Sequence, residues 1–193
     1  MTKVKVLIEG YAKELKTGWV ASSSVTLIQA NGKNIIVDPG CNRKKLLSAL
    51  KKEGLRPNGI NFILLTHSHA DHTLLAGIFE KAKVLTTEEI YNNDHQVTHD
   101  NKIPGTNLKI IKTSGHCPEH CSLVAISGED IYVVAGDVFW WTNDEKQTIN
   151  VNKKDEAHPV EVNMKKLKDS RKKILKIADY IIPGHGKMFK VKK

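Results

Sequence analysis

The sequence Thr66-His67-Ser68-His69-Ala70-Asp71-His72-Thr73 carries three histidines and one aspartate within six residues. It follows the apolar segment Ile60-Asn61-Phe62-Ile63-Leu64-Leu65, which predicts a buried strand. On an extended exit from that strand, His67 and His69 can point the same way because they are two residues apart. Asp71 and His72 can then turn back where a helix begins. One loop thus offers two pairs of ligands, which suits two metal ions about 3.5–4 Å apart, as in binuclear hydrolases.

The alternative for this loop is a polar connection between a strand and a helix that binds no metal. That interpretation suits a lone histidine. Here four metal-competent side chains share one loop, and three more candidates follow downstream. We therefore interpret the loop as part of a metal site.

Length and composition predict an ordinary globular chain. The 193 residues are enough to bury a sizeable core, and we expect one domain over residues 1–193. The chain is 40% hydrophobic and 26% charged, as is usual for soluble proteins. No apolar run reaches the roughly 18 residues that span a bilayer. Residues 1–8 alternate like a strand and lack the features of a signal peptide, so a cytoplasmic location is expected.

The three cysteines, Cys41, Cys117 and Cys121, are too few and odd in number for a disulfide framework. Cys117 and Cys121 flank His120 closely, and the three could in principle bind zinc. No second cysteine pair is present in the sequence to complete a structural zinc site. The pattern therefore favours reduced thiols near a metal site.

The formal net charge of +9 arises from 30 lysines and arginines, of which only Arg43, Arg56 and Arg171 are arginines. A basic surface can attract nucleic acid. The lysines are spread along the chain, however, and arginine, the better bidentate ligand for phosphate, is scarce. The pattern favours solvated lysine-rich faces and does not by itself indicate a nucleic-acid-binding protein.

The chain opens with strands and continues with strands that alternate with helices. We expect strands over residues 25–28, 34–38, 62–65, 83–86, 108–111, 121–126, 131–135 and 180–182. We expect helices over residues 44–53, 73–81 and 164–177. Residues 140–161 are polar and predict an irregular surface segment. This order predicts an α/β fold with two sheets, or one large mixed sheet, covered by helices.

Three further ligand candidates, His116, Asp137 and His185, each lie just past a predicted strand and directly after a glycine. A glycine lets the backbone turn tightly and come near an ion. Each candidate is weak alone, because Gly-Asp and Gly-His pairs often mark ordinary turns. Their order, together with the first cluster, favours one shared metal site at the ends of the strands.

The combined pattern resembles the metallo-β-lactamase superfamily. The matching elements are His67-x-His69-x-Asp71-His72, then His116, Asp137 and His185 in that order, after Val37-Asp38-Pro39-Gly40 near the start. The resemblance extends from about residue 20 to residue 187. It implies an αββα sandwich of two mixed β-sheets flanked by helices, with the metals at one edge of the two sheets.

The resemblance also implies which residues hold the metals. Asp137 would bridge two ions together with a water or hydroxide. Asp38 matches a position that supports the first cluster, which fits the rule that ligating histidines are oriented by hydrogen-bond partners. The remaining ligands that the resemblance implies are His67, His69 and His116 for one metal, and Asp71, His72 and His185 for the other.

The resemblance extends more weakly to His120, which lies four residues after His116, as in the Gly-His-x-x-x-His variants of the family. That spacing would place it near the substrate. We count it as a candidate catalytic residue together with Asp71 and Asp137, of which Asp137 would orient the nucleophile.

The other aromatic and histidine residues carry separate expectations. His95 and His99 lie in a polar loop and are expected to be solvated. His158, in the irregular segment, could reach the site as an acid. The pair Trp140-Trp141 would either form one wall of the pocket or divide between core and surface packing.

The expected reaction is metal-assisted hydrolysis by a binuclear hydrolase that uses a metal-bridging hydroxide. Two divalent ions lower the pKa of a shared water and polarise the oxygen under attack. A mixed histidine and carboxylate shell suits Zn²⁺, and Mn²⁺ or Fe²⁺ could be accommodated. The expected substrate is a small ester, thioester or lactone. Penicillin is not expected, because no cysteine stands in the ligand position that some zinc β-lactamases use.

Two alternatives remain. One is a metal-dependent ribonuclease, because the chain is basic and residues 136–141 resemble small members of the family with a proposed RNA-cleaving role. The other is oxidation by a single iron at the first site, as in persulfide dioxygenases of the same fold. The expected partner is a small-molecule substrate, with RNA as the alternative and no membrane; an exposed aromatic near the site would permit a homodimer. The basic candidates beside the site are Lys153-Lys154, Lys165-Lys166 and Arg171-Lys172-Lys173.

Overall fold

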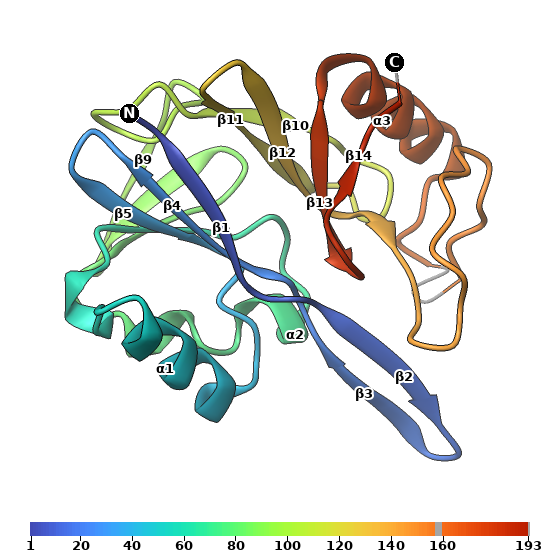
Figure 1. Ribbon diagram of the computed structural model, residues 1–193, viewed down its shortest axis with the longest axis horizontal. Coiled ribbons are helices and arrows are strands. Elements are labelled where there is room, and N and C mark those ends of the chain that lie inside the picture. The colour runs from blue at the N-terminus through green and yellow to red at the C-terminus, as the bar shows by residue number, and fades with distance from the viewer. Residues whose placement is uncertain (157–159, 193) are drawn as a thin grey trace.

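The computed structural model describes residues 1–156 and 160–192, and their strands form two large sheets and a separate hairpin. In the order in which they lie side by side, the strands of the first sheet are β1 (Lys3–Ile8), β4 (Val25–Ala30), β5 (Lys33–Val37), β6 (Phe62–Leu64), β7 (Lys83–Leu85), β8 (Glu89–Asn92) and β9 (His95–Thr98). Those of the second are β10 (Lys109–Lys112), β11 (Cys121–Ser127), β12 (Asp130–Trp140), β13 (Tyr180–His185) and β14 (Phe189–Lys190). The hairpin, β2 (Tyr11–Leu15) and β3 (Gly18–Ser22), projects away from both sheets (Figure 1).

The two sheets pack against each other through one hydrophobic core. Val37 and Leu64 contribute to it from the first sheet, and Val134 and Ile182 contribute from the second. Both sheets are mixed, because β5, β6 and β7 run parallel in the first and β12 and β13 run parallel in the second. Their central strands are apolar on both faces, as expected for strands that are covered on both sides.

The outer face of each sheet is covered by a helix (Figure 1). On α1 (Arg43–Lys52), Leu46 and Leu50 are buried with Ile36 and Ile63 of the first sheet. The side chain of Asn42 accepts a hydrogen bond from the backbone N–H of Lys45 and caps this helix. The arrangement of helix, sheet, sheet and helix confirms the expected αββα sandwich.

The second sheet is covered by α3 (Met164–Ile177), whose bounds match the predicted helix. Leu167 and Ile174 pack against Val133 and Ile181. The helical spacing of these apolar residues was sufficient to locate the helix because one face is buried along its whole length.

The prediction of a helix over residues 73–81 is wrong. The structure has a shorter helix, α2 (Ala70–Thr73), followed by a 3₁₀ turn, η2 (Ala76–Ile78). Distant backbone groups replace the helical hydrogen bonds: the N–H of Ser23 donates to the carbonyl of Asp71, and the N–H of Leu75 donates to the carbonyl of Gly40. The chain leaves the helix because its carbonyls bind the neighbouring loops instead.

Two strands also differ from the prediction. The strand expected to end at residue 135 continues as β12 to Trp140, so Asp137 lies within a strand whose register with β13 shifts around Gly136. The polar loop expected around His95 forms β8 and β9, with His95 exposed at the start of β9. β9 is an edge strand of the first sheet and its four residues are exposed, so it carries little apolar signal.

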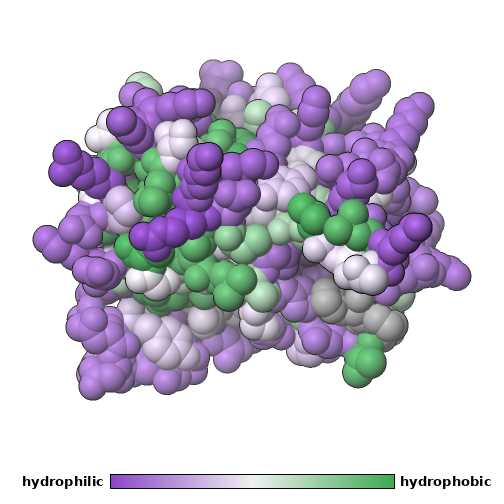
Figure 2. Space-filling model, turned by 90° about the horizontal axis from the view of Figure 1, so that it is seen from below, coloured by the Kyte–Doolittle hydropathy of each residue, from purple (hydrophilic) through white to green (hydrophobic). Residues whose placement is uncertain are grey.

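The surface carries many hydrophilic side chains, which dominate the face seen in Figure 2, with hydrophobic patches between them. In the part of the chain that the structure describes, no helix has the length and apolar character needed to cross a membrane.

Candidate metal centre

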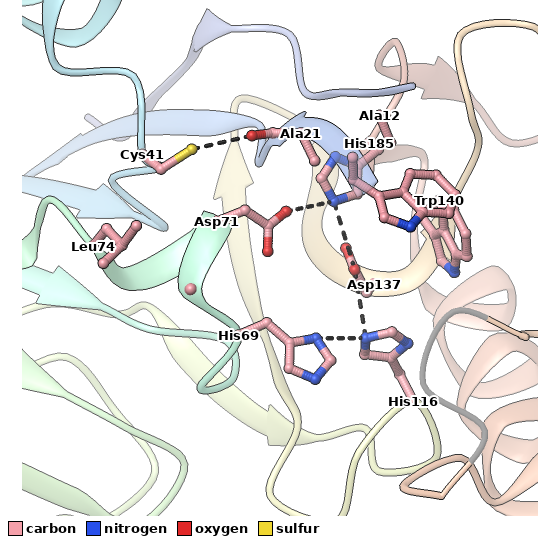
Figure 3. Close-up of a pocket in the computed structure, with 12 residues that line it drawn as sticks. Ala12, Ala21, Cys41, His69, Asp71, Leu74, His116, Asp137, Trp140 and His185 are labelled. Atoms are coloured by element: carbon pink, nitrogen blue, oxygen red, sulfur yellow. Dashed lines mark hydrogen bonds and ion pairs between the residues drawn. The ribbon is translucent and has the colours of Figure 1, made fainter. Parts of the chain in front are cut away.

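Seven histidine and aspartate side chains converge where loops and strand ends of both sheets meet. Two of the histidines precede α2, and two further side chains lie on it. The others come from the loop between β10 and β11, from β12 and from the last residue of β13. Figure 3 shows five of the seven pointing toward one another across the pocket. The seven are His67, His69, Asp71, His72, His116, Asp137 and His185.

The first ligand group comprises His67, His69 and His116. Nδ1 of His69 lies 3.0 Å from Nε2 of His67 and 3.1 Å from Nε2 of His116. Oδ2 of Asp137 lies 3.5 Å from Nε2 of His116. The nitrogens of His67 and His69 therefore face one point, as their spacing predicted.

The second ligand group comprises Asp71, His72 and His185. Oδ2 of Asp71 lies 3.2 Å from Nε2 of His185 and 4.0 Å from Nε2 of His72. Oδ1 of Asp137 lies 3.2 Å from Nε2 of His72. Asp137 thus stands between the groups, with one carboxylate oxygen near a histidine of each.

Other residues fix the outward-facing nitrogens of these histidines. Nδ1 of His72 donates to Oδ2 of Asp38 at 2.8 Å, and Asp38 also accepts from the backbone N–H and hydroxyl of Thr66. This confirms the expected supporting position of Asp38. Nδ1 of His185 lies 3.1 Å from the carbonyl oxygen of Tyr11. Such partners hold a ring so that its other nitrogen faces the metal.

Asp155 and Glu161 hold two further rings, those of His116 and His69, and no local pattern in the sequence indicated either acid. Nδ1 of His116 lies 2.7 Å from Oδ2 of Asp155, and Nε2 of His69 lies 3.2 Å from Oε2 of Glu161. Both acids lie in the irregular segment, where no motif or periodicity marks them.

The electrostatics of the centre show that it is built for positive charge. Burial opposes ionisation of Asp137, but the neighbouring His72 and His185 lower the pKa of this carboxyl well below its usual value. Burial likewise opposes protonation of His72, yet Asp137 and Asp38 raise its pKa well above its usual value. The carboxylate of Asp137 is therefore ionised at neutral pH and faces buried imidazoles.

Buried polar atoms test whether metal ions fit this centre. Nε2 of His72 and Oδ1 of Asp137 are buried, and neither makes a hydrogen bond of acceptable geometry, although they lie 3.2 Å apart. Leaving such atoms unpaired is costly unless a ligand satisfies them. Imidazole nitrogens and carboxylate oxygens are ligands of Zn²⁺, Mn²⁺ and Fe²⁺. The residues present fit two divalent cations.

His120 is near the centre but is not exposed to a substrate. It is fully buried, and its Nε2 accepts the backbone N–H of Asp137 at 3.1 Å while Nδ1 bonds the hydroxyl of Thr113 at 3.0 Å. Burial lowers the pKa of His120 to about 3, so the ring is neutral and can accept that hydrogen bond. The structure therefore places His120 behind Asp137, outside the lining of the pocket.

A cavity of about 380 Å³ opens onto the ligand groups. Trp140 lines it, whereas Trp141 is buried in the core beneath the second sheet. The two tryptophans thus divide, with one forming a wall of the pocket. Trp19 of β3 and Leu74, both substantially exposed, form another part of the lining.

The remaining candidates lie away from the ligands or take other roles. Cys117 and Cys121 are buried thiols, as favoured from the sequence. Arg171, named among basic residues beside the site, is 2% exposed and donates to backbone carbonyls. Nε2 of His99 bonds the carbonyl of Thr86. His158 lies outside the described residues.

Replacing His95 with alanine is expected to leave turnover within about twofold of the parent. Its side chain is exposed on β9, and no ligand group contains it. The measurement is the steady-state rate of the metal-loaded protein, with His69→Ala as the positive control. A loss comparable to that of His69→Ala would place the site elsewhere.

Comparison with known proteins agrees with this geometry. The sequence model of the metallo-β-lactamase superfamily matches residues 18–109. Metallo-β-lactamase domain-containing protein 1 of Xenopus laevis is 34% identical over 97% of this chain and 81% of its own length. The chain belongs to the metallo-β-lactamase superfamily. A hydroxyacylglutathione hydrolase from Xanthomonas euvesicatoria is 31% identical, over 59% of this chain and 45% of the relative.

Solved structures share the fold of this superfamily member. A candidate metallo-β-lactamase from Thermotoga maritima superposes with a TM-score of 0.72 at 16% identity, covering 98% of this chain and 99% of the other. The dizinc quorum-quenching lactonase AidC has a TM-score of 0.62 at 17% identity, covering 87% and 74%. A di-iron-bound protein has a TM-score of 0.65 at 19% identity, covering 95% of each chain. Membership and the hydrolase relatives support a metal-dependent hydrolase.

Proposed function

We propose that the chain is a binuclear metal-dependent hydrolase of small carboxylic esters, thioesters or lactones. The observation that carries the proposal is the position of Asp137, whose two carboxylate oxygens lie near His72 of one ligand group and His116 of the other. A carboxylate between two ligand groups suits a bridge between two ions.

In such a hydrolysis, the residues of the site would have different roles. Histidines of the two groups would hold the ions, and Asp137 would contribute to both groups and orient the attacking water. Asp71, held by His185 at 3.2 Å, faces the cavity and is placed to accept a proton. When bound, the ions would supply a hydroxide at neutral pH and polarise the carbonyl under attack.

The lining of the cavity favours a neutral carbonyl substrate over a phosphodiester. Beside the ligands, the described lining residues are apolar, aromatic or thiol side chains, and none of them is lysine or arginine. A phosphodiester backbone would need cationic side chains here to compensate its charge. An apolar acyl or alcohol group would instead bury its surface against Trp19, Leu74 and Trp140.

The choice of metal rests on the chemistry of the ligand set. Imidazole and carboxylate ligands suit Zn²⁺, and we propose zinc on that ground. Similar structures include both a dizinc and a di-iron form. Metal analysis of the purified protein tests the choice, because two zinc ions per chain support it. One iron per chain together with oxygen consumption would instead indicate a dioxygenase.

A ribonuclease is the second candidate, favoured by one observation. A groove between β1 and α1 is lined by Lys5, Lys44, Lys45 and Lys52, and Asn42 of its lining directly follows Cys41 of the metal cavity. A nucleic-acid strand could follow these lysines toward the ligands.

One experiment separates the two functions. The metal-loaded protein is given labelled single-stranded RNA and, in parallel, a panel of p-nitrophenyl esters, thioesters and lactones. Hydrolysis of the panel without RNA cleavage supports the proposal. RNA cleavage that disappears in the Asp137→Ala variant would show that the ribonuclease is correct.

Replacing Trp19 with alanine is expected to lower kcat/KM for an octanoyl ester about tenfold and to leave an acetyl ester nearly unchanged. The half-exposed indole lines the cavity and would lose its contact with a long acyl chain only. The control is Val97→Ala, which removes a similarly exposed apolar side chain from β9. An equal loss for both esters would contradict an acyl-binding role.

A further inference from the structure

The segment between β12 and α3 contacts the first ligand group through a buried carboxylate. Asp155 is 5% exposed, and its Oδ2 accepts a hydrogen bond from Nδ1 of His116 at 2.7 Å. Because Nδ1 carries the proton in this bond, the lone pair of Nε2 is directed toward His69 and Asp137, at 3.1 and 3.5 Å. Asp155 therefore determines both the tautomer and the orientation of this ring.

Arg171 of α3 explains how residues 151–155, which lie outside the helices and strands, place a carboxylate so close to His116. Its Nη1 donates to the carbonyls of Val151 and Lys153, and its Nε donates to the carbonyl of Val138 on β12. One buried guanidinium thus ties the segment to the strand that carries Asp137. Its positive charge also attracts the carboxylate of Asp155.

The burial of Asp155 is not explained by stability. Its Oδ1 is buried without a hydrogen-bond partner among the described residues. A buried carboxylate with an unpaired oxygen costs free energy, so this position weakens the fold unless the charge has another use. The charge of a carboxylate behind an imidazole makes that imidazole a better metal ligand.

The second ligand group has the same construction. There His72 donates to the buried carboxylate of Asp38 at 2.8 Å. Each ligand group thus contains one histidine that is backed by a buried aspartate. The two aspartates come from different parts of the chain, since Asp38 follows β5 of the first sheet and Asp155 precedes α3.

We propose that Asp155, held in place by Arg171, is a positioning residue that sets the affinity of the first ligand group for its metal through His116. Asp38 likewise sets the affinity of the second ligand group for its metal, through His72. The inference rests on the proposed function only in that it requires the first group to bind a metal.

The test compares zinc affinities by competition with a chromophoric chelator. Asp155→Asn should bind one of two zinc ions about 10- to 100-fold more weakly than the parent. Glu156→Gln, which removes the same charge from the exposed neighbouring residue, should leave both affinities unchanged. Asp38→Asn should weaken the other ion. In a His116→Ala background, Asp155→Asn should cause no further loss, because its only route to the metal is removed.

Thermal unfolding of the metal-free proteins distinguishes an effect of the substitution on metal binding from an effect on folding. A positioning role predicts that metal-free Asp155→Asn still unfolds in one cooperative transition well above the temperature of the assay, so that its weaker zinc binding does not arise from unfolding. If this variant unfolds earlier and binds both ions as tightly as the parent, Asp155 is structural and the proposal is wrong, while the proposed hydrolase stands. The proposal would also be overturned if Asp155→Asn lowered zinc affinity in the His116→Ala background as much as it does in the parent. A parent that binds no zinc or other divalent ion would overturn the proposed function as well.

Discussion

Replacing Asp137 with alanine is expected to lower turnover by about a thousandfold or more and to weaken metal binding at both ligand groups. The carboxylate of Asp137 approaches both groups, with Oδ1 3.2 Å from Nε2 of His72 and Oδ2 3.5 Å from Nε2 of His116. Under the proposed function, its removal would take a ligand from each ion and the orienting group from the water. Metal content after dialysis and the rate of ester hydrolysis measure the two losses.

The fold should survive this substitution. The side chain of Asp137 lies among polar ligands and belongs to none of the three hydrophobic clusters, and its backbone N–H still donates to His120. Circular dichroism should therefore match that of the parent. Asp130→Ala, at the start of the same strand, is the matched control and should retain activity and both ions. Full turnover by the Asp137 variant would show that the bridging assignment is wrong.

The clustering of the candidate ligands could be predicted because these residues have local signals in the sequence. His67 and His69 follow an apolar strand at a spacing of two, and His116, Asp137 and His185 each follow a glycine. Such signals depend only on neighbouring residues. The structure brings these side chains together because strand ends of both sheets meet at one edge.

Apart from Asp38, the supporting residues have no comparable signal. Asp155 binds a histidine 39 positions earlier in the chain, and its own surroundings are polar and irregular. The orientation of His120 toward the backbone of Asp137 likewise depends on the packing of β11 against β12. The helix expected after the metal loop failed for the same reason, since hydrogen bonds from Ser23 and to Gly40 end it. These features depend on contacts between segments that are distant in the chain. The hydrophobic periodicity of the sequence reports only local structure and does not reveal such contacts.

The second large effect is expected at a residue that binds no metal: Gly184→Ala should reduce turnover and metal content about as severely as Asp137→Ala. A Cβ atom built on Gly184 would lie 1.7 Å from Oδ1 of Asp137 and 2.9 Å from its Cγ. The backbone of Gly184 is not in the left-handed region, so the cost of the alanine is steric. The carboxylate must therefore leave the position between the ligand groups.

The backbone of Gly184 cannot move away instead. Its carbonyl accepts the N–H of Ser24 at 2.7 Å, and a Cβ on Gly10 would lie 2.0 Å from the same oxygen. Overpacking of this kind costs about 1–3 kcal/mol, which a urea titration measures, and leaves most of the protein folded. Gly77→Ala is the matched control, because a Cβ there meets nothing within 4 Å. If Gly184→Ala kept both ions and full turnover, the carboxylate of Asp137 would not occupy the bridging position, and the two ligand groups would have to bind their ions independently.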